Sequence, residues 1–410
     1  MNKIIHTSDW HLGQRLEGQD RAAEQQAFLD WLLVETERLG ADALVVCGDV
    51  FDVANPPIEA VRMLYGFLAR VRQLCPNVIL TGGNHDSGAR LDAMGTLAAE
   101  LGITIIGGMP AAASDCILPL RDRTGHCFAR LAAVPYLRSG DLAAAAPDED
   151  TAAQHGRVLY SIKMLYGRVL EAAEASLQSG EALVVTGHLF ARGGTVGEGE
   201  RAAHVEAGNL LAVPADIFGK RTDYVALGHL HRAQRAAKLP PVWYSGTPLP
   251  LTFGEADRGQ SVQLIVVDGG AVVSVEAVGV PRSSELYDID GEREEVFARL
   301  AELVAKHGAG SPRAWLRVTV KEREPDPGIR DAVGDALADS SLHLIAVRRS
   351  GAGAGGALAD RAPEQRLDEL APEKVFEILH QQRFDCPPEA AVVDAFAELL
   401  QGVLTAEDAT

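Results

Sequence analysis

Side chains that can bind metal ions follow short apolar runs of the sequence. A valine-rich run ends at Gly48 and is followed at once by Asp49. A run this short, bounded by glycine, indicates a strand buried on both faces, so Asp49 is expected at the carboxyl end of that strand, where α/β sheets place their ligands. Apolar runs at 2–7, 78–81, 182–186 and 224–227 end in the same way. Together the runs present Asp9, His11, Asp49, Asn84, His188, His229 and His231.

This set combines carboxylates, one amide oxygen and imidazoles without a thiolate, which suits a hard or borderline divalent ion such as Mn²⁺. Seven ligands are too many for one catalytic ion that must keep open positions. A carboxylate has two oxygens able to bridge a metal pair, so two divalent ions with Asp49 between them are the economical assignment. Metals roughly 3.5–4 Å apart can drive in-line hydrolysis of a phosphate ester. The sequence therefore predicts a phosphoesterase.

The motifs D-x-H, G-D-x-x-D, G-N-H-D, G-H and G-H-x-H, in this order, resemble those of the calcineurin-like metallophosphoesterase superfamily. Within it, residues 6–14, 48–52 and 226–234 are similar to the SbcD family, the nuclease subunits of bacterial double-strand-break repair complexes. The likeness extends to residues 244–248 and 347–350 and to the chain length, and is weakest at 111–180 and after 351.

The resemblance assigns roles to individual residues. It implies one metal held by Asp9, His11, Asp49 and His231, and a second held by Asp49, Asn84, His188 and His229. It makes His85 a catalytic residue that protonates the leaving 3′ oxygen or steadies the pentacoordinate phosphorus, with Asp86 orienting its other ring nitrogen. Archaeal and eukaryotic relatives carry histidine at the place of Asp52, which here either orients a ligand imidazole or caps the next helix. His6 is expected to pack within its strand.

Helical spacing of apolar residues at 20–39 and 57–74 alternates with the motif strands and predicts a layered α/β domain. By resemblance this is a β-sandwich flanked by helices, and it covers residues 1–280. No chemistry is assigned to an insert at 107–180. Residues 281–350 alternate strand and helix, which predicts a small α+β module of the split-βαβ kind. The resemblance implies that this module caps the active-site cleft and helps select the form of DNA.

Residues 351–410 begin with a glycine and alanine linker and continue with apolar residues at helical spacing. Two amphipathic helices on a tether are expected to bury their apolar faces on a partner, or else on the chain itself. The resemblance identifies the partner as an SbcC-type, SMC-like ATPase and implies a homodimer within a heterotetramer. The formal charge of −19 is unfavourable for a stand-alone DNA binder, so it also favours a complex.

The five cysteines are scattered, which fits a reducing cytoplasm, and no apolar run reaches the ~18 residues that span a bilayer. The interpretation is a Mn²⁺-dependent DNA nuclease. ATP-dependent 3′ to 5′ exonuclease action on duplex ends, hairpin opening and single-strand cleavage are implied by the resemblance. The alternatives are a phosphoesterase of small or cyclic nucleotides, which shares the motifs, and a scaffold with a decayed site, which the full ligand set disfavours.

Overall fold

The structure is a computed structural model. It describes residues 1–144, 150–195, 211–308, 313–321 and 328–350, together with His380, Val392 and Val393. The chain divides into one unit of Met1–Val320 with Asp326–Arg348 and a second of Lys321–Pro325 with Arg349–Thr410. Apart from His380, Val392 and Val393, the predicted tail helices lie outside the described residues. None of the helices described here is long and apolar enough to cross a membrane.

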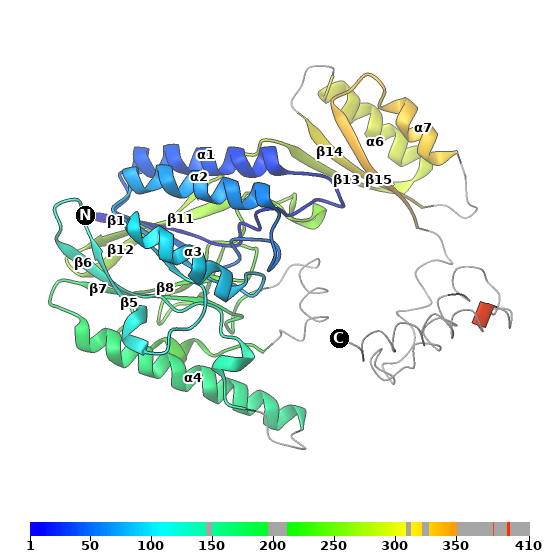
Figure 1. Cartoon of the computed structure of the whole chain (residues 1–410). Helices are drawn as coiled ribbons and strands as arrows, with labels where there is room; N and C mark the ends of the chain where they lie inside the picture. Colours follow the sequence, from blue (N-terminus) through cyan, green and yellow to red (C-terminus); the bar gives the residue numbers. More distant parts are fainter. Residues whose placement is uncertain are drawn as a thin grey trace. The chain divides into compact units, whose positions relative to one another are not determined.

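Two six-stranded sheets form the centre of the first unit (Figure 1). The first has the order β12-β11-β1-β2-β3-β4 and comprises β1 (Asn2–Thr7), β2 (Ala43–Cys47), β3 (Asn77–Thr81), β4 (Ile103–Ile106), β11 (Ser261–Asp268) and β12 (Ala271–Gly279). The second has the order β5-β6-β7-β8-β10-β9 and comprises β5 (Ile117–Arg121), β6 (Cys127–Ala132), β7 (Ala182–His188), β8 (Tyr224–Gly228), β9 (Gln234–Ala237) and β10 (Val242–Tyr244). Strands β1 to β4 are parallel, as are β6, β7, β8 and β10.

Strand β2 is buried on both faces, as predicted. Leu44 and Val46 pack into the core between the first sheet and its helices, whereas Val45 and Cys47 pack into the core between the two sheets. The first of these cores lies under α1 (Ala22–Leu39), α2 (Ile58–Leu74) and α3 (Gly88–Glu100), and the second sheet is covered by α4 (Thr151–Ser176) (Figure 1). The predicted layered α/β architecture is confirmed.

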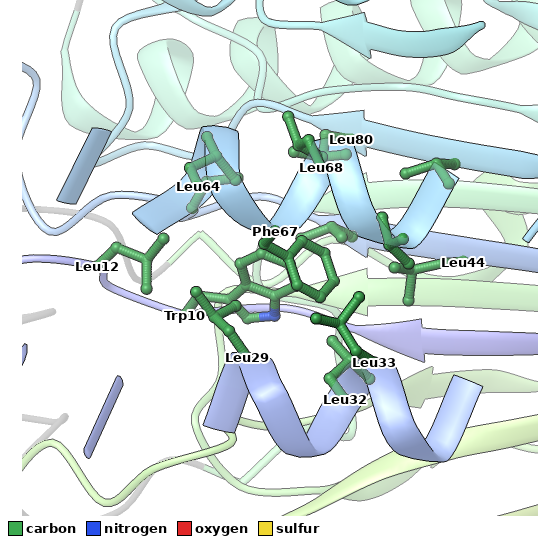
Figure 2. Close-up of a cluster of buried hydrophobic side chains, with 14 of the residues drawn as sticks. Trp10, Leu12, Leu29, Leu32, Leu33, Leu44, Leu64, Phe67, Leu68 and Leu80 are labelled. Atoms are coloured by element: carbon green, nitrogen blue, oxygen red, sulfur yellow. The ribbon is translucent and has the colours of Figure 1, made fainter. Parts of the chain in front are cut away.

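Trp10 anchors the loop that follows β1. Its ring makes edge-on contacts with Phe28 of α1 and Phe67 of α2, at centroid distances of 5.7 and 5.3 Å. Figure 2 shows this ring between the two helices, among Leu29, Leu32, Leu33, Leu64 and Leu68. Its indole N–H donates to Thr7 Oγ1 at 2.9 Å, so both the apolar body and the polar atom of the ring are satisfied. The residues on either side of Trp10 are the predicted ligands Asp9 and His11, which this packing holds in place.

The interpretation of residues 107–180 as an insert was wrong. This segment supplies β5 and β6, which belong to the second sheet, and α4, which covers that sheet. Strand β6 lies directly beside β7, and so supports the strand that ends at His188. The sequence signal was weak because β5 is an edge strand interrupted by Pro119 and only partly buried.

A three-stranded sheet in the order β13-β14-β15 completes the described part of the chain. It is built from β13 (Glu285–Glu292), α6 (Arg293–Lys306), β14 (Ala314–Lys321), α7 (Ile329–Ala336) and β15 (Leu342–Ser350), around an apolar core of its own. The strand and helix order matches the prediction, but the split-βαβ topology was wrong, because strands consecutive in the chain are neighbours in the sheet. The domain boundaries at 280 and 350 remain predictions.

Side chains of β14 contact the region next to the Asp9 and His11 loop. The Trp315 indole N–H donates to Glu24 Oε1 at 2.5 Å, and Arg317 forms an ion pair with Glu17 at 2.8 Å. Trp315 also joins Leu16 and Phe253 in a small apolar cluster. The small sheet is thus connected to α1 by a buried hydrogen bond, and to the loop before α1 by an exposed ion pair.

Candidate metal centre

The carboxyl ends of the parallel strands bring the predicted ligands together. The loops after β1 and β2 are joined by backbone hydrogen bonds, from Asp9 N to Gly48 O and from His11 N to Asp49 O, both at 3.0 Å. Asp9, His11, Asp49 and His229 have positive φ angles of 54, 45, 49 and 95°. Such backbone is uncommon for non-glycine residues and costs of order 1–3 kcal/mol each, a strain that collects at functional sites.

Glycines allow the backbone of these loops to approach the ligands closely. A Cβ on Gly48, whose φ is +81°, would lie 2.2 Å from His188 Nδ1. A Cβ on Gly83 would lie 2.1 Å from Asp49 Oδ1. Both glycines of the G-D and G-N-H-D motifs are therefore required by close packing around the site.

The first group of candidate ligands comprises Asp9, His11 and His231, whose ligand atoms lie within 4.8 Å of one another. The His11 and His231 rings are 5.3 Å apart between centroids. His11 Nε2 is buried and has no hydrogen-bond partner, although Nδ1 of the same ring lies 3.2 Å from Asp52 Oδ1. A buried nitrogen left without a partner is costly unless something absent from the hydrogen-bond network binds it, as a metal ion would.

The second group surrounds the amide oxygen of Asn84. Asn84 Oδ1 lies 2.9 Å from His188 Nε2 and 3.0 Å from His229 Nδ1. His188 Nε2 is also 3.1 Å from Asp49 Oδ2. An amide oxygen, two imidazoles and a carboxylate thus converge from the ends of β2, β3, β7 and β8.

Asp49 lies between the two groups. Its Oδ2 is 3.1 Å from His188 Nε2 and 3.7 Å from His11 Nε2, while its Oδ1 accepts a hydrogen bond from the His85 backbone N–H at 2.8 Å. The expectation that Asp49 connects two ion positions fits this geometry. The backbone bond to Oδ1 fixes the orientation of the Asp49 carboxylate, which would hold metal ions together with both groups.

The charges of the site also call for a cation. Burial raises the pKa of Asp9, against the attraction of His188. Burial alone would also raise the pKa of Asp49, but the charge and hydrogen bond of His188 lower it below the usual range. Burial disfavours charge on His188 as well, yet Asp49 and Asp9 raise its pKa to about 9. Among the described residues no lysine or arginine pairs with either carboxylate. A metal ion bound here would supply positive charge and displace the proton of His188.

The donor set therefore fits divalent metal ions: buried carboxylate oxygens, an amide oxygen, imidazole nitrogens and one orphaned nitrogen. The clustering of ligand atoms also yields Asp9, Asp49 and His188 as one group and His11, Asp52 and His85 as another. The first of these groups combines Asp9 and His188 from different implied ligand sets, and the second contains Asp52 and His85, which belong to neither set. The division of the residues between two ions therefore stays a prediction.

Two carboxylates support ligand imidazoles from behind. Asp52 contacts His11 Nδ1, whereas α2 begins after Pro57 with no side-chain cap, so the geometry favours the orienting role of Asp52 over the capping role. Glu255 was missed by the sequence reasoning. Its Oε1 lies 3.1 Å from His231 Nδ1, and Oε2 accepts from Leu251 N at 2.8 Å. Burial opposes charge on Glu255, but its contact with His231 lowers the pKa of this carboxyl.

We expect Glu255→Gln to weaken metal binding by about 10- to 100-fold, the usual cost of losing an outer carboxylate behind a ligand histidine. Glutamine is close to glutamate in size but is neutral, and its one oxygen cannot accept from both His231 Nδ1 and Leu251 N. Calorimetric titration with Mn²⁺ measures the effect. Glu276→Gln, at an exposed position of β12, removes the same charge away from the site and serves as the control. Equal titration curves for both variants would contradict the role given to Glu255.

His85 differs from the ligands because it is exposed. Its Nδ1 lies 2.7 Å from the backbone carbonyl of Asp52, and since a carbonyl only accepts, Nδ1 carries the hydrogen. Nε2 is therefore the atom that can take up or give a proton. The expectation that Asp86 orients this ring was wrong. The buried Asp86 carboxylate accepts instead from the backbone N–H groups of Val50, Phe51 and Gly83, at 3.1, 2.9 and 2.8 Å.

Arg138 is a second residue that the sequence reasoning missed. Its Nη2 donates to the backbone carbonyls of Gly83, at 3.2 Å, and Asp86, at 2.5 Å. These two bonds span the turn that carries Asn84 and His85. Arg138 lies in the segment after β6 to which no chemistry had been assigned, and no neighbouring motif could have indicated it. The predicted packing role of His6 is confirmed: it is fully buried, and its ring contacts Tyr224 OH and Leu227 O at 3.1 and 3.2 Å.

Comparison with known proteins places this geometry in a family. Residues 2–233 match the family model described as calcineurin-like phosphoesterase, and residues 282–384 match the one described as type 5 capsule protein repressor C-terminal domain. The SbcD subunit of nuclease SbcCD from Escherichia coli K12 is 32% identical over 377 residues, which are 91% of each chain. The protein of the same name from Rhodobacter capsulatus is 32% identical over 389 residues, covering 91% of this chain and 93% of the relative. That from Bacillus subtilis is 33% identical over 271 residues, covering 64% and 66%.

The matched residues include every candidate ligand, from Asp9 to His231. The chain belongs to the calcineurin-like phosphoesterases, which are metal-dependent phosphoester hydrolases, and within them to the family of SbcD subunits of nuclease SbcCD.

Proposed function

We propose that this chain is the nuclease subunit of an SbcCD-type complex and cleaves DNA phosphodiester bonds with two divalent ions, most favourably Mn²⁺. The observation that carries the proposal is Asp49 Oδ2, which lies between imidazoles of two ligand groups, beside the exposed His85. The donor set of oxygens and imidazoles suits Mn²⁺, which is compatible with both ligand types.

In this proposal Asp9, His11, Asp49 and His231 hold one ion, and Asp49, Asn84, His188 and His229 hold the other. When bound, such ions neutralise charge on a phosphoryl group and activate water as the nucleophile. Asp52 and Glu255 fix the rings of His11 and His231 from behind. Arg138 fixes the turn that presents Asn84 and His85.

His85 acts on the leaving group. With Nδ1–H donating to the Asp52 carbonyl, the protonated ring carries its second proton on Nε2, which faces away from that bond. Nε2 gives this proton to the leaving 3′ oxygen or holds the charge of the pentacoordinate phosphorus. His85 is exposed whereas the candidate ligands are buried or half-buried, which supports contact of His85 with substrate.

The relatives' name places such a nuclease subunit in a two-component complex. We propose an SMC-like ATPase of the SbcC type as the partner, bound through residues 351–410, and DNA ends, hairpins and single strands as substrates. Exonuclease polarity, ATP dependence and a homodimer within a heterotetramer are part of the same proposal. The β13 to β15 module, connected through Trp315 and Arg317, is proposed to cap the active site.

The test is an assay of the purified protein with Mn²⁺ on linear duplex, hairpin and single-stranded DNA, with a mononucleotide and a cyclic nucleotide as controls. Hydrolysis of DNA in preference to both nucleotides is expected. Preferential hydrolysis of the nucleotides would instead support the small-substrate phosphoesterase.

A further inference from the structure

A cavity of about 190 Å³ lies directly beside the first ligand group. It is bounded by the segment after β8, which carries His231 and Arg232, and by the segment that leads into β11, which carries Glu255, Arg258 and Gln260. His231 thus borders both the candidate metal centre and this cavity.

Most polar side chains of the cavity wall are already occupied. Glu255 contacts His231 and Leu251 N, as described above. Gln260 donates through Nε2 to Glu255 O at 3.2 Å and accepts through Oε1 from Arg282 Nε at 3.1 Å. The hydroxyl oxygen of Thr247 lies 2.9 Å from Asp9 O and 2.8 Å from Leu249 O. None of these groups is left to bind a ligand.

The guanidinium groups differ. Arg258 Nη1 is buried from solvent and has no hydrogen-bond partner. Within the described ranges of the chain, no acidic side chain forms an ion pair with Arg258, and none with the exposed Arg232. In a chain with a net charge of −19, two arginines without acidic partners beside a metal centre stand out. A buried cationic donor without an acceptor is costly, which points to an anion as the missing partner.

The backbone of Arg258 is held independently of its guanidinium. Its carbonyl accepts a hydrogen bond from Arg282 Nη2, and its N–H donates to Glu255 O at 3.3 Å. The side chain is therefore presented from a fixed position. A planar guanidinium with paired N–H donors matches the oxygens of a phosphate group.

We propose that Arg258, together with Arg232, forms a second phosphate subsite, which binds the nucleic-acid phosphate next to the scissile one. The proposal rests on the proposed function, because the DNA substrate proposed there carries a phosphate on the nucleotide next to the scissile bond. It also gives a physical basis for preferring DNA over a single phosphodiester, which reaches the metal centre but has nothing to place between the arginines.

Binding of a fluorescein-labelled single-stranded oligonucleotide to the full chain, measured by anisotropy in EDTA over a salt series, tests the subsite without hydrolysis. For Arg258→Gln we expect a Kd about tenfold higher, the loss of one charge-assisted hydrogen bond. The slope of log K against log salt should fall by about 0.7, the value for one phosphate of a single strand. Arg258→Lys keeps the charge and should retain most of the slope, but not the full affinity.

Arg221→Gln is the matched control, since Arg221 is an exposed arginine before the start of β8, at the end opposite to His229. With Mn²⁺, the ratio of kcat/KM for the oligonucleotide to kcat/KM for bis(p-nitrophenyl) phosphate should fall about tenfold in Arg258→Gln and stay constant in the control.

Equal binding of the oligonucleotide by Arg258→Gln and Arg221→Gln would overturn the subsite. An equal fall of kcat/KM for the oligonucleotide and for the small ester in Arg258→Gln would also overturn it, because Arg258 would then only support Glu255 and His231. If Arg258→Gln does not fold, Arg232→Gln can replace it, because Arg232 is exposed. The subsite then requires that the slope of log K against log salt falls in this variant, and an unchanged slope would overturn it. Failure of the proposed function looks different, because the wild-type chain would then cleave the small ester and leave the oligonucleotide intact.

Discussion

Asp49→Ala is expected to lose metal binding and hydrolysis together, with activity falling on the order of 10³-fold or more. The physical reason is the position of Oδ2 between His188 and His11, which leaves both ligand groups incomplete when the carboxylate is removed. Metal analysis of the purified variant by mass spectrometry, together with Mn²⁺-dependent hydrolysis of an oligonucleotide, measures both effects. Retention of both ions by the variant would show that Asp49 is not shared between them.

His85→Ala provides the contrasting variant, because it should keep its metal and lose turnover by about 10²- to 10⁴-fold, the contribution of a general acid. The bond from His85 to Asp49 Oδ1 comes from the backbone N–H and survives the substitution, so the ligand geometry has no reason to change. His126→Ala, an exposed histidine between β5 and β6, is the control for removal of an imidazole. Metal loss in His85→Ala equal to that in Asp49→Ala would contradict its assigned role.

The candidate ligands were predictable because they combine two local signals. Each follows a short apolar strand, and a parallel sheet places the carboxyl ends of its strands at one edge. Burial of β2 on both faces follows from its apolar composition, with Leu44 and Val45 packing into different cores. The motif glycines then allow the loops to close around the ligands, because a Cβ on Gly48 would lie only 2.2 Å from His188 Nδ1.

Asp52 was named from the sequence as a possible support of a ligand imidazole, but the supporting residues Glu255 and Arg138 were not predictable. Glu255 is distant in sequence from the His231 ring that it supports, and it lies in a single 3₁₀ turn, Phe253–Glu255, without a repeated pattern. Arg138 acts on the carbonyls of Gly83 and Asp86, which carry no sequence information of their own. Asp86 was given the wrong partner because sequence proximity favours His85, whereas its carboxylate satisfies three backbone N–H groups.

Edge and short strands were missed for a related reason. Strands β9 and β10 have only four and three residues, and the first of them is half-exposed, so neither shows a clear alternation of apolar and polar residues. Their place in the second sheet is set by pairing, of β10 with β8 and of β9 with β10, which is a contact between segments rather than a property of either segment. The split-βαβ prediction failed in the same way, since the order of elements along the chain does not fix their order in the sheet.

Removal of residues 357–410 is expected to abolish binding of the SMC-like ATPase. Mn²⁺-dependent hydrolysis of single-stranded DNA or of a small phosphodiester should stay within about twofold of the full chain, because the removed residues are independent of the metal centre. All candidate ligands and their supporting residues lie between Asp9 and Glu255. Strand β15 ends at Ser350, which also precedes the cut. The division of the chain also places Arg349–Thr410, together with Lys321–Pro325, in a unit separate from the one that holds the candidate ligands.

The truncated chain would thus retain its metal centre and lose the ATPase that presents duplex DNA, so ATP-stimulated degradation of duplex ends should disappear with complex formation. Co-elution with the ATPase and duplex degradation in the presence of ATP are the two measurements. The Asp49→Ala full chain is the complementary control, because it should bind the ATPase normally and degrade nothing. Complex formation by the truncated chain would mean that the apolar positions at helical spacing in residues 367–403 do not dock on a partner, and the contact surface would then have to be sought on the first unit.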